Sequence, residues 1–401
     1  MKLNLVIFLS AVILTAQSAG LSAQETKSAE DMTTLPMQLS IVYPMTTQGY
    51  KTIDYRYIIS FNLFSGKVGA VTGVEFGGFL NHVRHDIIGV QFGGLGNFAR
   101  TAIGVQFGGL GNVSQNSTGV QFGGLGNISQ NFTGVQFGGL GNISQNFTGI
   151  QFGGIANISE NVNGVQFGGL TNLSKHTKGA QISGVVNATE KSEGLQLAGV
   201  ANVSEEVSGA SISGVFNVTK TLRGFQLGVV NVIDTIESGL SVALVNIVRK
   251  GFYDEWSLTF ADYLNVGLSY KMGTQKFYTI YTAGANFLED RLWVFGIGFG
   301  NRTELSPRID FQPEIVSYQY FPDDFKNVQN VTANHLKIGF VYKLNNKLGV
   351  TIAPSIYHLY NDLSKNQDKY KVSPFSPVYK HENSKRLHSF GAGLSVGLSL
   401  R

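Results

Sequence analysis

Apolar and polar residues alternate through the middle of the chain, and this pattern recurs with a period of 15 residues. One unit is Gly119–Thr133, with the sequence GVQFGGLGNISQNFT, in which the second and fourth residues are apolar and the third is Gln. Because a period of two is that of a β-strand, each unit predicts a strand followed by a polar turn. A fixed period of this length indicates stacked or serially duplicated β units.

Two positions mark the register of the repeat. A glycine opens each unit, from Gly89 to Gly239 without an insertion, and a degenerate first copy begins at Gly73. We therefore assign residues 73–250 to a repeat region. An asparagine closes the strand half of the units and is interpreted as a structural ladder residue, at Asn97, Asn112, Asn127, Asn142, Asn157, Asn172, Asn187, Asn202 and Asn217.

Two all-β folds satisfy this alternation. In a β-solenoid each unit is one coil, and equivalent residues stack about 4.8 Å apart. In the alternative, a single large up-and-down outer-membrane β-barrel, each unit is one strand and neighbouring strands run in opposite directions. A barrel would favour a period of two units, whereas the stretch Ile-Ser-Gln-Asn-Phe-Thr occurs in two adjacent units. The pattern therefore favours a β-solenoid.

A different alternation begins after the repeats and predicts an antiparallel, barrel-like β region at 251–401. Its clearest segment is Leu264–Met272, where apolar and polar residues alternate without a break. Long alternating strands that are rich in Tyr and Phe are typical of outer-membrane barrels. The polar, basic stretch Asn361–His388 is predicted to be an outer loop. The other predicted strands are Phe277–Phe287, Trp293–Phe299, Ile309–Tyr320, Leu336–Leu344, Val350–Tyr360 and Phe390–Leu400.

The N-terminal part predicts export. Residues 1–23 have a lysine, a short apolar run and then small residues, as in a signal peptide. Residues 24–72 are interpreted as a linker with two strands, Met37–Tyr43 and Asp54–Phe64, that pair with the C-terminal region and close its sheet.

Composition narrows the functional classes. The chain has no cysteine, which excludes disulfides and thiolate metal sites. Its net charge is only +4, so composition offers no basis for nucleic-acid binding. No serine elbow or His-Glu-x-x-His motif is present, and we expect neither an enzyme nor a cofactor.

Several short patterns resemble chemical sites but favour structural interpretations. His82 and His85 lie close to Arg84 and Asp86, which is more typical of a solvated turn than of a metal site. Asp323 and its neighbour Asp324 supply too few oxygens for calcium on their own. The Gly-Gly-Leu-Gly stretches lack the strand-loop-helix context of a phosphate loop, and the Asn-x-Ser/Thr triplets follow from the repeat.

The repeats nevertheless suggest a binding surface. The span from Thr101 to Ser159 contains no charged residue and is rich in Gln, Asn, Ser and Thr, which suits contacts with a glycan or a protein. The candidate binding face consists of the third residue of six units, Gln91, Gln106, Gln121, Gln136, Gln151 and Gln166. We predict a structural or adhesive role at the cell envelope, with an outer-membrane pore as the alternative.

The same residues carry a resemblance. The runs Gln38–Pro44 and Ser60–Phe64, the Gly-Val-Gln-Phe-Gly-Gly-Leu-x-Asn units, and the segment Gly239–Gly251 are similar to the surface-repeat proteins of diderm bacteria. The likeness covers about residues 37–300. It implies export to the outer membrane or cell surface of such a bacterium, and it implies no reaction.

Overall fold

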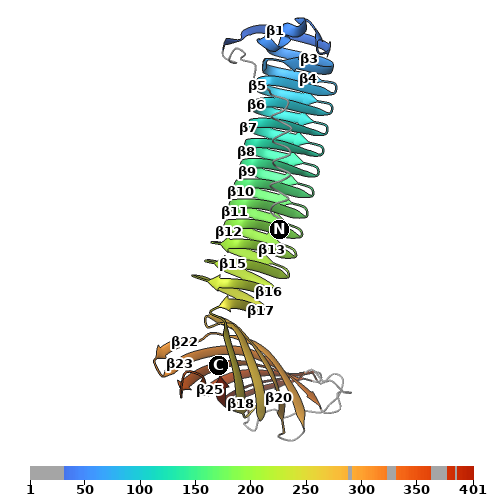
Figure 1. Cartoon of the computed structure of the whole chain (residues 1–401). Helices are drawn as coiled ribbons and strands as arrows, with labels where there is room; N and C mark the ends of the chain where they lie inside the picture. Colours follow the sequence, from blue (N-terminus) through green and yellow to red (C-terminus); the bar gives the residue numbers. More distant parts are fainter. Residues whose placement is uncertain (1–30, 288–290, 323–330, 363–376, 384–385) are drawn as a thin grey trace. The chain divides into compact units, whose positions relative to one another are not determined.

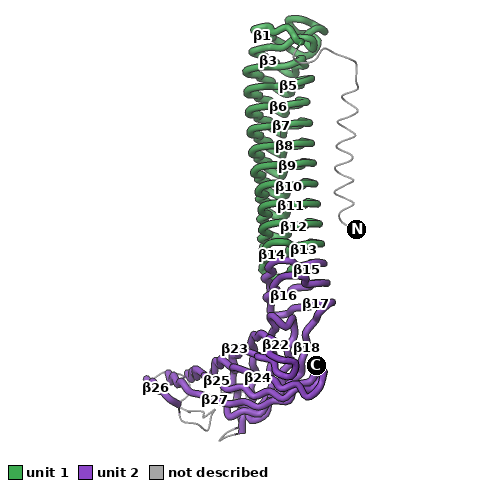
Figure 2. The backbone as a smooth tube through the Cα atoms, turned by 90° about the vertical axis from the view of Figure 1, so that its left-hand side faces the viewer, with its two compact units in different colours: residues 1–219 green, residues 220–401 purple. Residues whose placement is uncertain are grey.

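The computed structural model describes residues 31–287, 291–322, 331–362, 377–383 and 386–401. The predicted signal peptide at 1–23 lies outside these residues. The described chain forms two β-sheets, one from the strands up to β17 and one from β18 onward. It divides into two compact units, residues 1–219 and 220–401 (Figure 2). No helix among the described residues is long and apolar enough to cross a membrane.

The repeats form a β-solenoid, in which successive units stack as parallel rungs (Figure 1). Register is kept from Gly96 to Ala198, so that Asn112 lies beside Asn127 and Gln121 beside Gln136. Parallel pairing confirms the solenoid and shows that the single large up-and-down barrel is wrong for this region, because its strands would be antiparallel. The regular rungs are β5 (Leu80–Gly93), β6 (Gly96–Gly108), β7 (Gly111–Gly123), β8 (Gly126–Gly138), β9 (Gly141–Gly153), β10 (Ala156–Gly168), β11 (Thr171–Ser183) and β12 (Val186–Ala198).

Later rungs are shorter or split, and they complete the stack. They are β13 (Ala201–Val207), β14 (Ala210–Ser213), β15 (Phe216–Leu222), β16 (Phe225–Ile236) and β17 (Leu240–Lys250).

The unit-opening glycine bends each regular rung. Gly134 has a φ of 131°, which side-chain-bearing residues rarely adopt. A Cβ atom at Gly134 would lie 2.0 Å from the carbonyl oxygen of Gly119 in the preceding rung. Both the backbone conformation and the close stacking therefore require glycine at this position.

The N-terminal strands extend the solenoid and do not pair with the C-terminal region, so that prediction was wrong. β1 (Thr33–Val42) pairs in parallel with β3 (Tyr55–Val68), which in turn pairs in parallel with β4 (Ala70–Gly77). The short strand β2 (Met45–Thr46) and the 3-10 helix η2 (Gly49–Asp54) lie between β1 and β3. The physical reason is a shared polar interior: the hydroxyl of Ser60 donates to Gln38 across 2.7 Å, as side chains do between later rungs.

The C-terminal sheet is a closed antiparallel barrel of eight strands, and β18 pairs with β27 to close it. The predicted strands of this region were found, whereas β18 was missed. The barrel strands are β18 (Tyr253–Ala261), β19 (Val266–Thr274), β20 (Phe277–Asn286), β21 (Leu292–Gly300), β23 (Ile309–Pro322), β24 (Val331–Lys343), β25 (Leu348–Asp362) and β27 (Arg386–Leu400). Two short strands, β22 (Thr303–Ser306) and β26 (Tyr379–Glu382), pair with β23 and β27.

Candidate functional site

The solenoid encloses a ladder of buried asparagines. The side-chain amide of Asn127 donates to the carbonyl oxygen of Phe137 at 2.8 Å and to Oδ1 of Asn142 at 2.9 Å. Each asparagine thus donates to a buried backbone carbonyl and to the asparagine of the next rung, as the satisfaction of buried polar groups requires. The predicted ladder is confirmed along its length, through Asn97, Asn112, Asn127, Asn142, Asn157, Asn172, Asn187, Asn202 and Asn217.

The glutamines form a second buried ladder, and their prediction as a binding face was wrong. The side-chain amide of Gln136 donates to Oε1 of Gln121 at 2.8 Å and to Ser129 at 3.2 Å. Alternation along each strand places these side chains on the inner face, opposite the phenylalanines, where identical amides can bond to one another. None of the six is available to a ligand, because Gln91, Gln106, Gln121, Gln136, Gln151 and Gln166 are all buried.

A carboxyl group ends the glutamine ladder. Glu75 lies at the glutamine position of the first, degenerate unit and accepts a hydrogen bond from Gln91 at 2.8 Å. Asn62 and Ser60 also donate to it, at 3.0 and 3.1 Å. Burial raises the pKa of Glu75 to about 7, and the three donors only partly oppose this effect. A titratable group is therefore enclosed in the neutral interior.

The exterior of the solenoid carries the apolar residues. Phe107, Phe122 and Phe137 stack with ring centroids 4.9 to 5.0 Å apart and nearly parallel planes. The stack belongs to a longer row of phenylalanines that runs from Phe61 to Phe167, all exposed except the half-buried Phe167. The solenoid therefore has polar ladders inside, beside buried apolar side chains such as Phe132 and Phe147, and is largely apolar along this part of its surface.

The opposite edge of each coil is polar. Asn131 donates to Asn116 at 2.8 Å on the exposed side, and Asn146 donates to Asn131 at 2.7 Å. Charged residues enter this edge in later rungs, where Lys175 pairs with Glu160 at 3.1 Å. The solenoid thus has one apolar edge and one polar edge.

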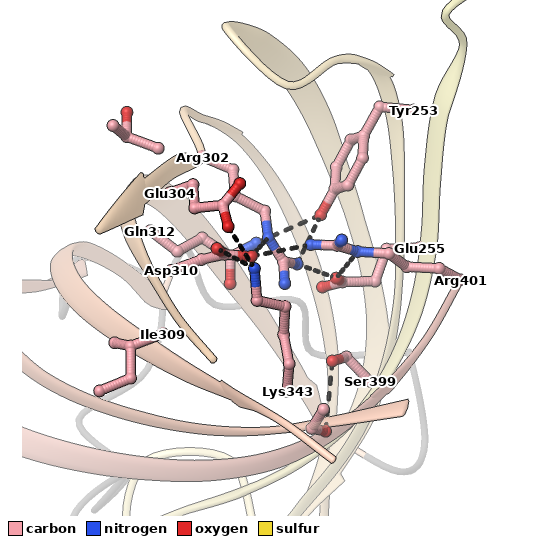
Figure 3. Close-up of polar contacts among 12 residues, drawn as sticks. Tyr253, Glu255, Arg302, Glu304, Ile309, Asp310, Gln312, Lys343, Ser399 and Arg401 are labelled. Atoms are coloured by element: carbon pink, nitrogen blue, oxygen red, sulfur yellow. Dashed lines mark hydrogen bonds and ion pairs between the residues drawn. The ribbon is translucent and has the colours of Figure 1, made fainter. Parts of the chain in front are cut away.

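Charged side chains fill one end of the barrel interior. Lys271 lies between Glu255, at 3.0 Å, and Glu314, at 2.7 Å. Arg302 contacts Glu255 and lies 2.8 Å from Asp310 (Figure 3). All five side chains are buried, and each is paired, as buried charges require.

Aromatic side chains fill the barrel beyond this network. Tyr263, Tyr318 and Tyr320 are buried together with His335, whose ring centroid lies 3.9 Å from that of Tyr263. The interior of an eight-stranded barrel is just wide enough for side chains to fill it. These residues therefore occupy the lumen.

The outer face of the barrel is apolar. On β18, Trp256, Leu258 and Phe260 are exposed, whereas the residues between them are buried in the interior. β21 repeats the pattern with four exposed residues, Trp293, Phe295, Ile297 and Phe299. The barrel thus has the polarity of a protein whose outer surface faces lipid.

The two rims of the barrel differ. The chain enters β18 and leaves β27 at one rim, which also has the tight turns at 275–276 and 344–347. The end of β25 and the start of β27 lie at the other rim, and the longest connection between neighbouring barrel strands in the sequence joins them. The last rung, β17, contacts the tight-turn rim, where Thr279 donates to the carbonyl oxygen of Ala243 at 2.8 Å.

The possible metal-binding residues from the sequence do not form a metal site among the described residues. His82 and His85 both lie on β5, and burial lowers the pKa of His82 to about 4. Asp323 and Asp324 lie outside the described residues. Within the ranges that the structure describes, no group of three or more His, Asp or Glu residues could hold a metal ion.

No protein-family model matches the chain, and no curated protein or solved structure matches it. The fold therefore defines the protein only as a β-solenoid followed by a closed antiparallel barrel. Its resemblance to bacterial surface-repeat proteins stays a prediction.

Proposed function

We propose that the protein is an exported structural protein of a diderm bacterium, anchored by its barrel in the outer membrane. The observation that carries this proposal is the polarity of the barrel, which is apolar outside and charged inside. A barrel in water would expose charges and bury residues such as Trp256 and Phe295. Its strands, from 9 residues in β19 to 15 in β25, are long enough for an apolar band of about 25 Å.

The difference between the two rims supports an orientation of the barrel in the outer membrane. In outer-membrane barrels the short turns face the periplasm and the longer loops face outward. Because β18 begins at the tight-turn rim, the preceding repeats belong on the periplasmic side. The side chains that fill the lumen leave the repeats no route through the barrel. We thus propose a periplasmic scaffold, in place of an adhesive region on the cell surface.

A pore is not our proposal. Passive channels are formed by larger barrels with a water-filled lumen. Here paired charges and tyrosines occupy the interior. Planar-bilayer recordings of the purified protein should show no stepwise conductance, and regular conductance steps would favour the pore.

Membrane insertion can be tested with the full chain, expressed in a diderm host. We expect it in the outer-membrane fraction, and we expect unheated samples to migrate differently from heated ones in SDS gels. A soluble, heat-insensitive protein would contradict the proposal. Ile297→Lys places a charge on the lipid side of β21 and should destabilise the inserted barrel by about 2–4 kcal/mol. Asn131→Lys, on the exposed polar edge of the solenoid, is the control and should leave heat-modifiability unchanged.

A further inference from the structure

The apolar edge of the solenoid has a ridge with a groove on each side. The apolar ridge consists of residues at the Gly-Gly-Leu turn, each between 41% and 51% exposed: Leu95, Leu110, Leu125, Leu140, Ile155 and Leu170. One groove is lined by the phenylalanine stack and by glycine pairs such as Gly123 and Gly124. The other is lined by the ridge and by Val113, Ile128 and Ile143.

The surface is large enough to form a stable interface. With roughly 200 Å² for a whole Leu or Phe residue, the ridge and the phenylalanine row expose on the order of 1,000 Å² per copy. Monomeric soluble proteins rarely expose patches larger than a few hundred Å². A standard interface buries about 800 Å² on each partner, so a pairing along this edge meets that requirement.

Ridge and groove are complementary in shape and period. Both follow the same stack of rungs, and ridge residues in neighbouring rungs are joined by backbone hydrogen bonds, as from Leu125 N to the Leu110 carbonyl oxygen at 2.7 Å. A second copy has the same ridge spacing as the groove of the first. Such a self-complementary surface suits a two-fold, isologous pair.

The absence of charge along this edge also favours a second copy of the chain as its partner. No charged residue occurs between Thr101 and Ser159, so two copies can approach along these rungs without repulsion or burial of a charge. The charged pairs of later rungs, such as Lys178 with Glu193, lie on the other, polar edge.

We propose that the apolar ridge is the interface between two copies of this chain, each placing its ridge in a groove of the other. The pairing goes beyond the proposed function and does not depend on it. The relative direction of the two solenoids does depend on the proposed function. If both barrels lie in one membrane, the two solenoids must run in the same direction.

Crosslinking of the full chain in detergent solution tests the pairing, because the protein has no cysteine of its own. Leu125→Cys on the ridge should give a crosslinked dimer as the main product with a short bismaleimide. Thr133→Cys, on the polar edge of the same coil region, should stay monomeric. Equal crosslinking of the two variants, or none in either, would overturn the proposal.

Direction is tested with the two ends of the ridge. Leu95→Cys and Leu170→Cys should each crosslink to the same residue of the second copy if the copies run in the same direction. If the two variants are mixed and crosslinks form only between Leu95→Cys of one copy and Leu170→Cys of the other, the two solenoids run in opposite directions. That result would keep the dimer but contradict two barrels in one membrane, which separates failure of the pairing from failure of the proposed function.

Charge substitution supplies a second measurement. Leu125→Asp with Leu140→Asp should halve the mass measured by native mass spectrometry from detergent, while the β-rich circular dichroism spectrum is retained. Thr133→Asp with Thr148→Asp places the same charges on the polar edge and should leave the dimer mass unchanged. A monomeric wild type, together with quenching by brominated lipid of a fluorophore attached to Leu125→Cys, would instead identify lipid as the occupant and overturn the proposal.

Discussion

The solenoid and the barrel both have polar interiors, but they satisfy those interiors with different chemistry. Inside the solenoid the polar residues are almost all neutral, and identical amides bond from rung to rung, as Gln136 does to Gln121. Inside the barrel several of them are charged, and Lys271 lies between two carboxylates. Parallel, in-register stacking accounts for this difference.

An amide is both donor and acceptor, so identical amides can bond to each other in line. Carboxylates and ammonium groups repel their own kind, so a ladder of identical charges cannot form. The antiparallel barrel brings different residues together and can therefore use opposite charges. Glu75, where the glutamine ladder ends, is the exception in the solenoid.

The largest expected effect concerns the charged interior. Lys271→Met leaves Glu255 and Glu314 without one of their buried partners and should destabilise the barrel by about 4 kcal/mol. The temperature at which heat-modifiability is lost would measure the effect. Lys276→Met, at an exposed position in the adjacent turn, is the control. Equal stability of the two variants would mean that the network does not hold the barrel together.

The next effect depends on pH. Because folding raises the pKa of Glu75 from 4.5 to about 7, the folded state binds the proton more tightly than the unfolded state. The stability from this group is present below pH 4.5 and is lost as pH rises through about 7, in total about 3 kcal/mol. Glu75→Gln removes this titration, so denaturant unfolding should show the variant more stable than wild type at pH 8 and similar at pH 4. A pH-independent difference would contradict this account.

A smaller effect is expected for the asparagine ladder. Asn142→Ala removes the side-chain donor to the carbonyl of Phe152 and one hydrogen bond from each of the two neighbouring ladder amides, which should reduce the free energy of unfolding by about 2 kcal/mol. Asn146→Ala removes an amide from the exposed ladder, where water replaces it, and should have less than half that effect. Denaturant titration of both variants measures the difference. Equal losses would show that burial of the ladder contributes nothing.

Much of the fold was predictable because stacked, equivalent rungs leave a fixed period in the sequence. The 15-residue spacing of Asn112 and Asn127 predicted parallel stacking, and in-register asparagines followed from it. The glutamines were misplaced because alternation shows that the two faces of a strand differ in polarity, but it does not show which face is enclosed. An apolar interior is the usual arrangement, and here the self-pairing of amides allows the glutamines to lie inside beside apolar side chains such as Phe132.

Other errors arose where no repeat was present. β1 and β3 lack the strict spacing, so nothing in the sequence showed that Gln38 and Ser60 continue the buried ladder. β18 was missed although Trp256, Leu258 and Phe260 alternate with polar residues, because it follows the last rung so closely. The ion pairs of the barrel join residues far apart in the chain, such as Glu255 and Arg302, and sequence alone could not bring them together.

The central claim is that the barrel lies in the outer membrane with the repeats on its periplasmic side. Single cysteines at Val378, which is 85% exposed beside the longest connection, and at Thr133 in the solenoid test it directly with a membrane-impermeant maleimide. We predict labelling of Val378→Cys in intact cells and of Thr133→Cys only after the outer membrane is permeabilised. Labelling of Thr133→Cys in intact cells, with Val378→Cys protected, would contradict the account.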